Sequence, residues 1–140
     1  MKWIEPKTNW SIRIDQEKNY LGDYFEAEDY LRIRNNLYCL QELAEELGYL
    51  KNSVEIPLVT RQDFCSHEHI NTLEKVLSQL RVGTLSDLIQ KTKLWKENQP
   101  APVAEDWNRI ETSCLIVWRV FHRQKKSARR LPLRLGGGIF

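Results

Sequence analysis

Apolar residues recur along three segments of the chain with the spacing of an α-helix. In each segment the apolar positions step by three, then four, then three residues, which places them along one stripe of a helix. The stripes are Tyr30, Ile33, Leu37, Leu40, Ala44 and Leu47; Ile70, Leu73, Leu77 and Leu80; and Trp107, Ile110, Cys114, Val117 and Phe121. They predict helices over residues 27–48, 67–81 and 103–124. The sequence Thr84–Asp87 resembles a capping box and predicts a short fourth helix near 85–94. Because an amphipathic stripe must be covered, we expect a small all-α bundle of three or four helices.

The three segments also align with one another when the first is shifted by 40 or by 77 residues. The matching positions are Glu28, Glu68 and Glu105; Asp29 and Asp106; Asn71 and Asn108; and Arg32 and Arg109. The acidic residues fall in the first turn of each predicted helix, where they favour the positive end of the helix dipole. The pattern therefore indicates a degenerate helical repeat.

Segments without a helical period lie outside and between the predicted helices. Residues 11–15 and 131–135 alternate apolar and polar side chains like short strands, and residues 54–59 form a third extended candidate. Pro132 confines the last of these to a sheet edge or to a partner. We therefore expect an extended N-terminal arm, a helical bundle domain and a basic extended C-terminal tail. Their ranges are 1–22, 23–124 and 125–140.

The composition bounds the class of protein. The 140 residues are 41% hydrophobic and 29% charged, which is typical of one folded domain. The longest apolar run, Cys114–Trp118, is too short to cross a membrane. Three cysteines without a CxxC pair do not form a disulfide framework and are typical of a reducing compartment.

The net charge of +2 is unevenly distributed along the chain. Seven of the 21 basic residues follow Glu111 and no acidic residue does, so the part before it carries 14 basic against 19 acidic groups, a balance of −5. A basic tail on an acidic body is typical of a surface that meets an acidic partner. Nucleic acid is one possible partner, held by phosphate contacts and by stacking on Trp118 and Phe121.

Protein docking is the favoured interpretation of this tail. Leucines on every second residue suit the addition of a strand to another sheet, and buried aromatic and Arg side chains tend to dominate interface energies. The predicted partner-binding residues are Trp3, Trp10, Arg129, Arg130, Leu131, Leu133 and Leu135.

One cluster, Cys65–His69, has the residue types of a metal site. If Ser66 begins a helix, however, His67 and His69 turn to different faces. Cys114 lies in an apolar stripe, which predicts a small core residue instead of a nucleophile. We therefore expect no catalytic residue, no metal and no cofactor, and predict that the protein is not an enzyme.

The two outer copies of the repeat, within residues 23–36 and 100–111, resemble a phrase in small structural proteins of tailed bacteriophages. In that family an aromatic residue or Pro, a small residue, an acid and then Asn-Arg-Ile-Glu open a helix, often twice or more in one chain. The copy at Asp106–Glu111 matches best, whereas Leu31 replaces the Asn in the first copy and the middle copy lacks the Arg.

The resemblance implies a non-enzymatic structural subunit of the virion, in the tail or baseplate. It also implies assembly with other virion proteins, in multiple copies and with symmetry, in the cytoplasm of the bacterial host. The alternative is an accessory protein that binds nucleic acid with its basic C-terminal tail. Binding through several phosphate contacts would weaken steeply with salt, whereas a largely apolar dock would weaken far less.

Overall fold

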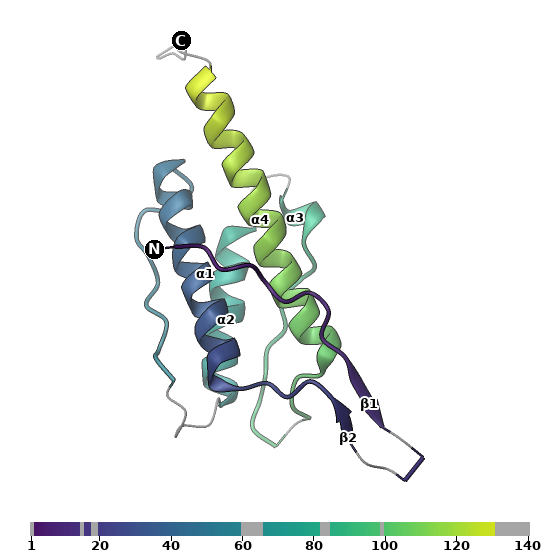
Figure 1. Cartoon of the computed structure of the whole chain (residues 1–140). Helices are drawn as coiled ribbons and strands as arrows, with labels where there is room; N and C mark the ends of the chain where they lie inside the picture. The colour runs from purple at the N-terminus through teal and green to yellow at the C-terminus, as the bar shows by residue number, and fades with distance from the viewer. Residues whose placement is uncertain are drawn as a thin grey trace.

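The computed structural model describes residues 2–14, 16–17, 20–59, 66–81, 85–98 and 100–130. Its elements are β1 (Ile12–Ile14), β2 (Tyr20–Gly22), α1 (Ala27–Glu46), α2 (His67–Leu80), α3 (Leu85–Leu88) and α4 (Ala104–Arg130). The long helices α1, α2 and α4 pack side by side, and the strands form a small hairpin at one end (Figure 1). The predicted all-α bundle is confirmed.

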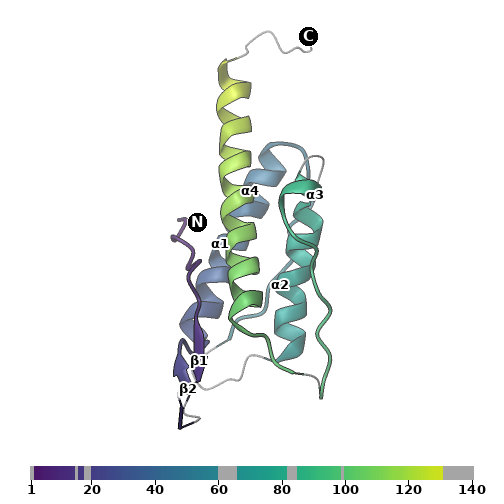
Figure 2. The ribbon, with the colours of Figure 1, turned by 90° about the vertical axis from the view of Figure 1, so that its right-hand side faces the viewer.

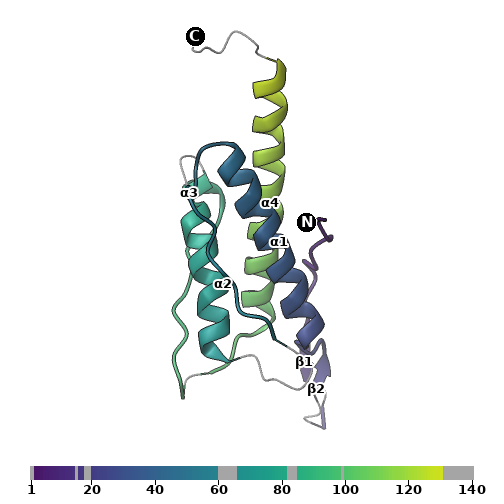
Figure 3. The ribbon, with the colours of Figure 1, turned by 90° about the vertical axis from the view of Figure 1, so that its left-hand side faces the viewer.

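The three long helices run in the same direction. The ring of Tyr30 near the start of α1 meets that of His69 near the start of α2, with centroids 5.8 Å apart. At the far end of α1, Glu46 pairs with Lys125 of α4 at 2.8 Å. Figures 2 and 3 show the same parallel arrangement from two sides, with α4 rising past the ends of its neighbours. The chain must therefore travel back along the bundle between helices.

The predicted stripes form the core. Each stripe residue except Leu47 is buried, and Leu47 packs against the core while partly exposed. Cys114 is buried among the apolar side chains, as its place in the stripe predicts. The spacing of apolar positions thus identified the buried face of every long helix.

Each long helix begins at an equivalent position of the repeat. The third residue of the helix accepts a hydrogen bond from the backbone N–H of the residue before the helix, as in a capping box. The acceptors are Asp29 for Glu26 (2.9 Å), His69 for Ser66 (3.1 Å) and Asp106 for Val103 (2.9 Å). Ser66 also accepts from the N–H of His69, which confirms it as the N-cap of α2.

The helix ends differ from the predicted ones. Helix α1 ends at Glu46 because Gly48 takes a left-handed conformation, with φ of 81°, and the N–H of Tyr49 turns back to the carbonyl of Ala44 at 2.8 Å. Helix α3 ends at Leu88, well before the predicted residue 94. Helix α4 continues to Arg130, so residues 125–130 of the expected extended tail are helical.

The extended segments also differ in part from prediction. Strand β1 lies within the predicted 11–15 segment, but its antiparallel partner β2 was not predicted, and the two pair with Ile12 opposite Gly22. Residues 54–59 are extended without joining a sheet. The predicted strand at 131–135 lies outside the described residues.

Candidate functional site

Side-chain amides of the helices hold the extended segments that run against them. In each case one carboxamide accepts from the backbone N–H and donates to the backbone carbonyl of the same extended residue. The pairs are Asn36 with Ile4, Gln41 with Val54, Asn71 with Trp95, and Asn108 with Trp10. We call these contacts amide clips. They satisfy backbone groups that would otherwise need a β-sheet partner.

A buried carboxylate completes the site around Trp10. Glu111 is 1% exposed and accepts the indole N–H of Trp10 at 2.6 Å and the backbone N–H of Lys7 at 3.0 Å. Arg32 of α1 donates two further hydrogen bonds to it, both at 2.8 Å. Burial alone lowers the pKa of Arg32, but its contacts with Glu111 and Asp29 outweigh this effect and raise the pKa. A buried charge with this many partners is compensated.

The same arrangement recurs around Trp95. Glu74 of α2 accepts the indole N–H of Trp95 at 2.9 Å, and the backbone N–H of Lys93 at 3.3 Å. Arg109 of α4 forms a two-point pair with it at 2.7 and 2.6 Å. In both copies, therefore, an Asn clips the backbone of a tryptophan and a Glu three residues later binds its indole.

Two arginines each link one long helix to another. Arg32 joins α1 to α4, and Arg109 joins α4 to α2. A third link from α2 to α1 would need an Arg at 72 and an acid at 34, but the chain has Thr72 and Arg34 there. Arg34 instead donates to the carbonyl of Ile56 at 2.9 Å, which holds the 54–59 segment against α1. The link between an Arg and a Glu of the repeat is thus made twice, and the contact of Arg34 with Ile56 takes the place of the third.

The structure corrects the expected role of the N-terminal arm. Residues 2–10 lie against α1 and α4 through the clips at Asn36 and Asn108. Trp10 is 6% exposed and packs near Phe25 and Trp107, so it belongs to the core of its own bundle. Trp10 lies inside the bundle because its indole N–H donates to the buried carboxylate of Glu111.

Trp3 is partly buried and stacks on Trp118 of α4, with ring centroids 4.2 Å apart. Arg129 and Arg130 end α4, but their side chains lie outside the described set, as do Leu131, Leu133 and Leu135. The seven predicted partner-binding residues therefore fall into two groups. The two tryptophans contact their own chain, and the basic and leucine residues stay predictions.

The C-terminal half of α4 carries a basic and aromatic face. Trp118, Arg119, His122, Arg123 and Lys126 line a shallow hollow of about 320 Å³. His122 meets the ring of Trp118 edge-on, with centroids 3.9 Å apart. Burial lowers the pKa of His122, and the positive charges of Lys125 and Lys126 lower it further. This face combines positive charge with an indole.

The described residues offer little for covalent or metal chemistry. Cys114 and Cys39 are both buried, and burial raises the pKa of each thiol, which disfavours the reactive thiolate. In the part of the chain that the structure describes, no three His, Cys, Asp or Glu residues come together as a possible metal site. Cys65 lies outside that part.

Among the described residues, no helix has the length and apolar character needed to cross a membrane. Comparison of the chain with models of protein families, with curated proteins and with solved structures finds no match.

Replacing Glu111 with Ala should destabilise the protein by about 3–5 kcal/mol, because the mostly buried Arg32 keeps only its contact with Asp29 and the Lys7 N–H loses its acceptor. The indole of Trp10 also loses its acceptor. Urea unfolding followed by circular dichroism measures the change. Glu105→Ala on the same helix is the control, since Glu105 is exposed, and it should cost less than about 1 kcal/mol. Equal losses for the two variants would contradict the role given to Glu111.

Stability should decrease as the pH falls through the ordinary His pKa of 6.5, because His122 takes up its proton less readily when folded than when unfolded. Glu46 opposes this effect, whereas Lys125 and Lys126 strengthen it. Urea unfolding of the wild type and of His122→Gln at several pH values from 7.5 down to 5 measures it. The wild type should lose more stability than the variant, and identical pH dependence would overturn the assignment.

Proposed function

We propose that the chain is a structural subunit of a bacteriophage virion, in the tail or baseplate, and that it works by protein–protein assembly and not by catalysis. The observation that carries the proposal is the repeated helix-opening phrase, complete at Asp106–Glu111 and modified at Asp29–Arg34. This phrase resembles one found in small structural proteins of tailed phages. Its partners would be other virion proteins, and its location the virion.

The geometry supports a role as a rigid spacer. Every residue type in the phrase has a mechanical role: the acid caps the helix, Asn108 clips an extended segment, Arg109 pairs with α2, Ile110 fills the core and Glu111 binds an indole. A bundle cross-linked in this way resists deformation. Such rigidity suits a subunit that fixes the distance between neighbours.

The projecting end of α4 supports contact with neighbours. Helix α4 extends beyond α1 and α2 and carries basic residues without acidic ones after Glu111 (Figure 1). An exposed basic helix end is suited to an acidic surface on another subunit. Assembly in multiple copies would place these ends around a symmetric ring.

Nucleic acid is the second candidate partner, favoured by the face around Trp118. Arg119, Arg123 and Lys126 could contact phosphates there, and the indole could stack on a base. Trp118 is already stacked on Trp3, however, which leaves less of its ring for a base. For this reason we favour the protein partner.

The proposal is tested on intact particles. Particles purified from the source are washed in high salt, and the chain is quantified on them by mass spectrometry against a known virion protein. We expect a fixed copy number that survives the wash, because a structural subunit is held by buried contacts. Loss of the chain from washed particles would refute the virion role, and binding to nucleic acid that falls steeply with salt would favour the second candidate.

A further inference from the structure

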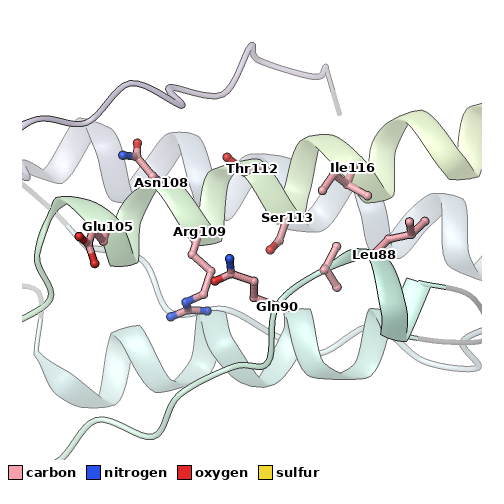
Figure 4. Close-up of a pocket in the computed structure, with 9 residues that line it drawn as sticks. Leu88, Gln90, Glu105, Asn108, Arg109, Thr112, Ser113 and Ile116 are labelled. Atoms are coloured by element: carbon pink, nitrogen blue, oxygen red, sulfur yellow. The ribbon is translucent and has the colours of Figure 1, made fainter.

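A groove lies between α4 and the segment that follows α3. It encloses about 430 Å³, and its lining residues include Leu88, Gln90, Glu105, Arg109, Ser113 and Ile116. In Figure 4, Glu105 lies at one end and Leu88 and Ile116 at the other, with Arg109, Gln90 and Ser113 between them. The groove is therefore polar in the middle and apolar at one end.

Two polar groups of the groove have no partner in the described part of the chain. Arg109 is 8% exposed, and its Nε–H donates to no described atom, although both of its outer nitrogens bind Glu74. The equivalent Arg32 donates its Nε–H to Glu111. Gln90 makes no hydrogen bond within the described residues. The groove thus has an exposed carboxamide available to a ligand, beside a buried Nε–H without a described partner.

The charges around the groove select a neutral acceptor. Glu74 already compensates Arg109, and Glu105 adds a negative charge to the lining, so an anionic ligand would be repelled. A peptide carbonyl can accept from the carboxamide of Gln90 without adding charge. At the other end, Leu88 is 53% exposed and lies beside Ile116, where an apolar side chain would be covered.

The other carboxamides of this chain show which ligand Gln90 suits. Asn36, Gln41, Asn71 and Asn108 each bind the N–H and carbonyl of one extended residue. Gln90 can form the same two bonds with an extended peptide. The groove therefore has a carboxamide that could act as an amide clip and an apolar contact beside it. No described segment of the chain occupies that carboxamide.

We propose that this groove binds the C-terminal segment of a second copy, through its Leu131–Leu135 sequence. This inference rests on the proposed role in assembly and names one partner for it. The segment has leucines on every second residue, which places them on one face of an extended chain. It contains no acidic residue, which matches the neutral or basic ligand that the groove selects.

A second copy is favoured over the same chain by the direction of α4. Arg130 lies fourteen residues beyond Ile116, which is about 21 Å along the helix. The segment would have to reverse direction to reach its own groove. The groove of a neighbour can be reached without such a reversal. Repetition of this contact from copy to copy is heterologous and closes into a ring when the rotation allows.

The test is sedimentation velocity of the full chain over a range of concentrations. Leu88→Asp and Leu133→Asp each place a charge in the proposed apolar contact, one on each side of it. Leu94→Asp is the matched control, because Leu94 lies on the extended segment that follows α3, is 71% exposed and does not line the groove. Circular dichroism checks that the helix content of all three variants equals that of the wild type.

We expect the wild type and Leu94→Asp to associate as concentration rises, and Leu88→Asp and Leu133→Asp to associate at least about tenfold more weakly. An excess of a synthetic peptide of residues 129–137 should dissociate the wild-type complex. A monomeric wild type, or equal association of Leu88→Asp and Leu94→Asp, would overturn the groove proposal.

This result is separable from that of the particle experiment. A chain that stays monomeric alone but is retained on washed particles overturns the groove proposal and leaves the virion role standing. A chain that associates as predicted but is absent from washed particles overturns the virion role and leaves self-association standing.

Discussion

Two buried carboxylates, Glu74 and Glu111, determine how the parts of this bundle fit together. Each one needs several donors, because an ionised group removed from water is costly unless it is paired. An Arg from a neighbouring helix and the indole of a tryptophan from an extended segment meet at each carboxylate. Each carboxylate therefore fixes two things at once: the position of one helix along another, and the path of the extended segment that runs between helices.

The helices are parallel, and this arrangement creates the need for contacts that hold the extended segments between them. Helices that all point one way require extended segments to run back between them, and those segments bring backbone N–H and carbonyl groups that need partners. In this chain the partners come from side chains. The amide clips supply them, two of them at matching positions of the repeat, so a fold with one small hairpin among its described residues can hold long extended segments.

The fold could be predicted to a large extent because burial follows the apolar stripes. The repeated acids also marked the helix starts, since Asp29 and Asp106 cap α1 and α4. The clips were not predicted, although Asn71 and Asn108 were matched by the repeat alignment, because a polar residue beside a stripe does not reveal its partner. The partner of Asn108 is Trp10, which lies 98 positions away in the chain. Spacing within one helix holds no information on such a contact.

Trp10 and Trp95 lie outside the helices but should be held as firmly as the core. Hydrogen exchange of the indole N–H groups, followed by NMR, tests this most directly. The indole protons of Trp10 and Trp95 should exchange as slowly as backbone amides in the middle of α1 and α4, because both are bound to buried carboxylates. Exchange at the rate of an exposed loop would contradict the claim that these carboxylates hold the extended segments in place.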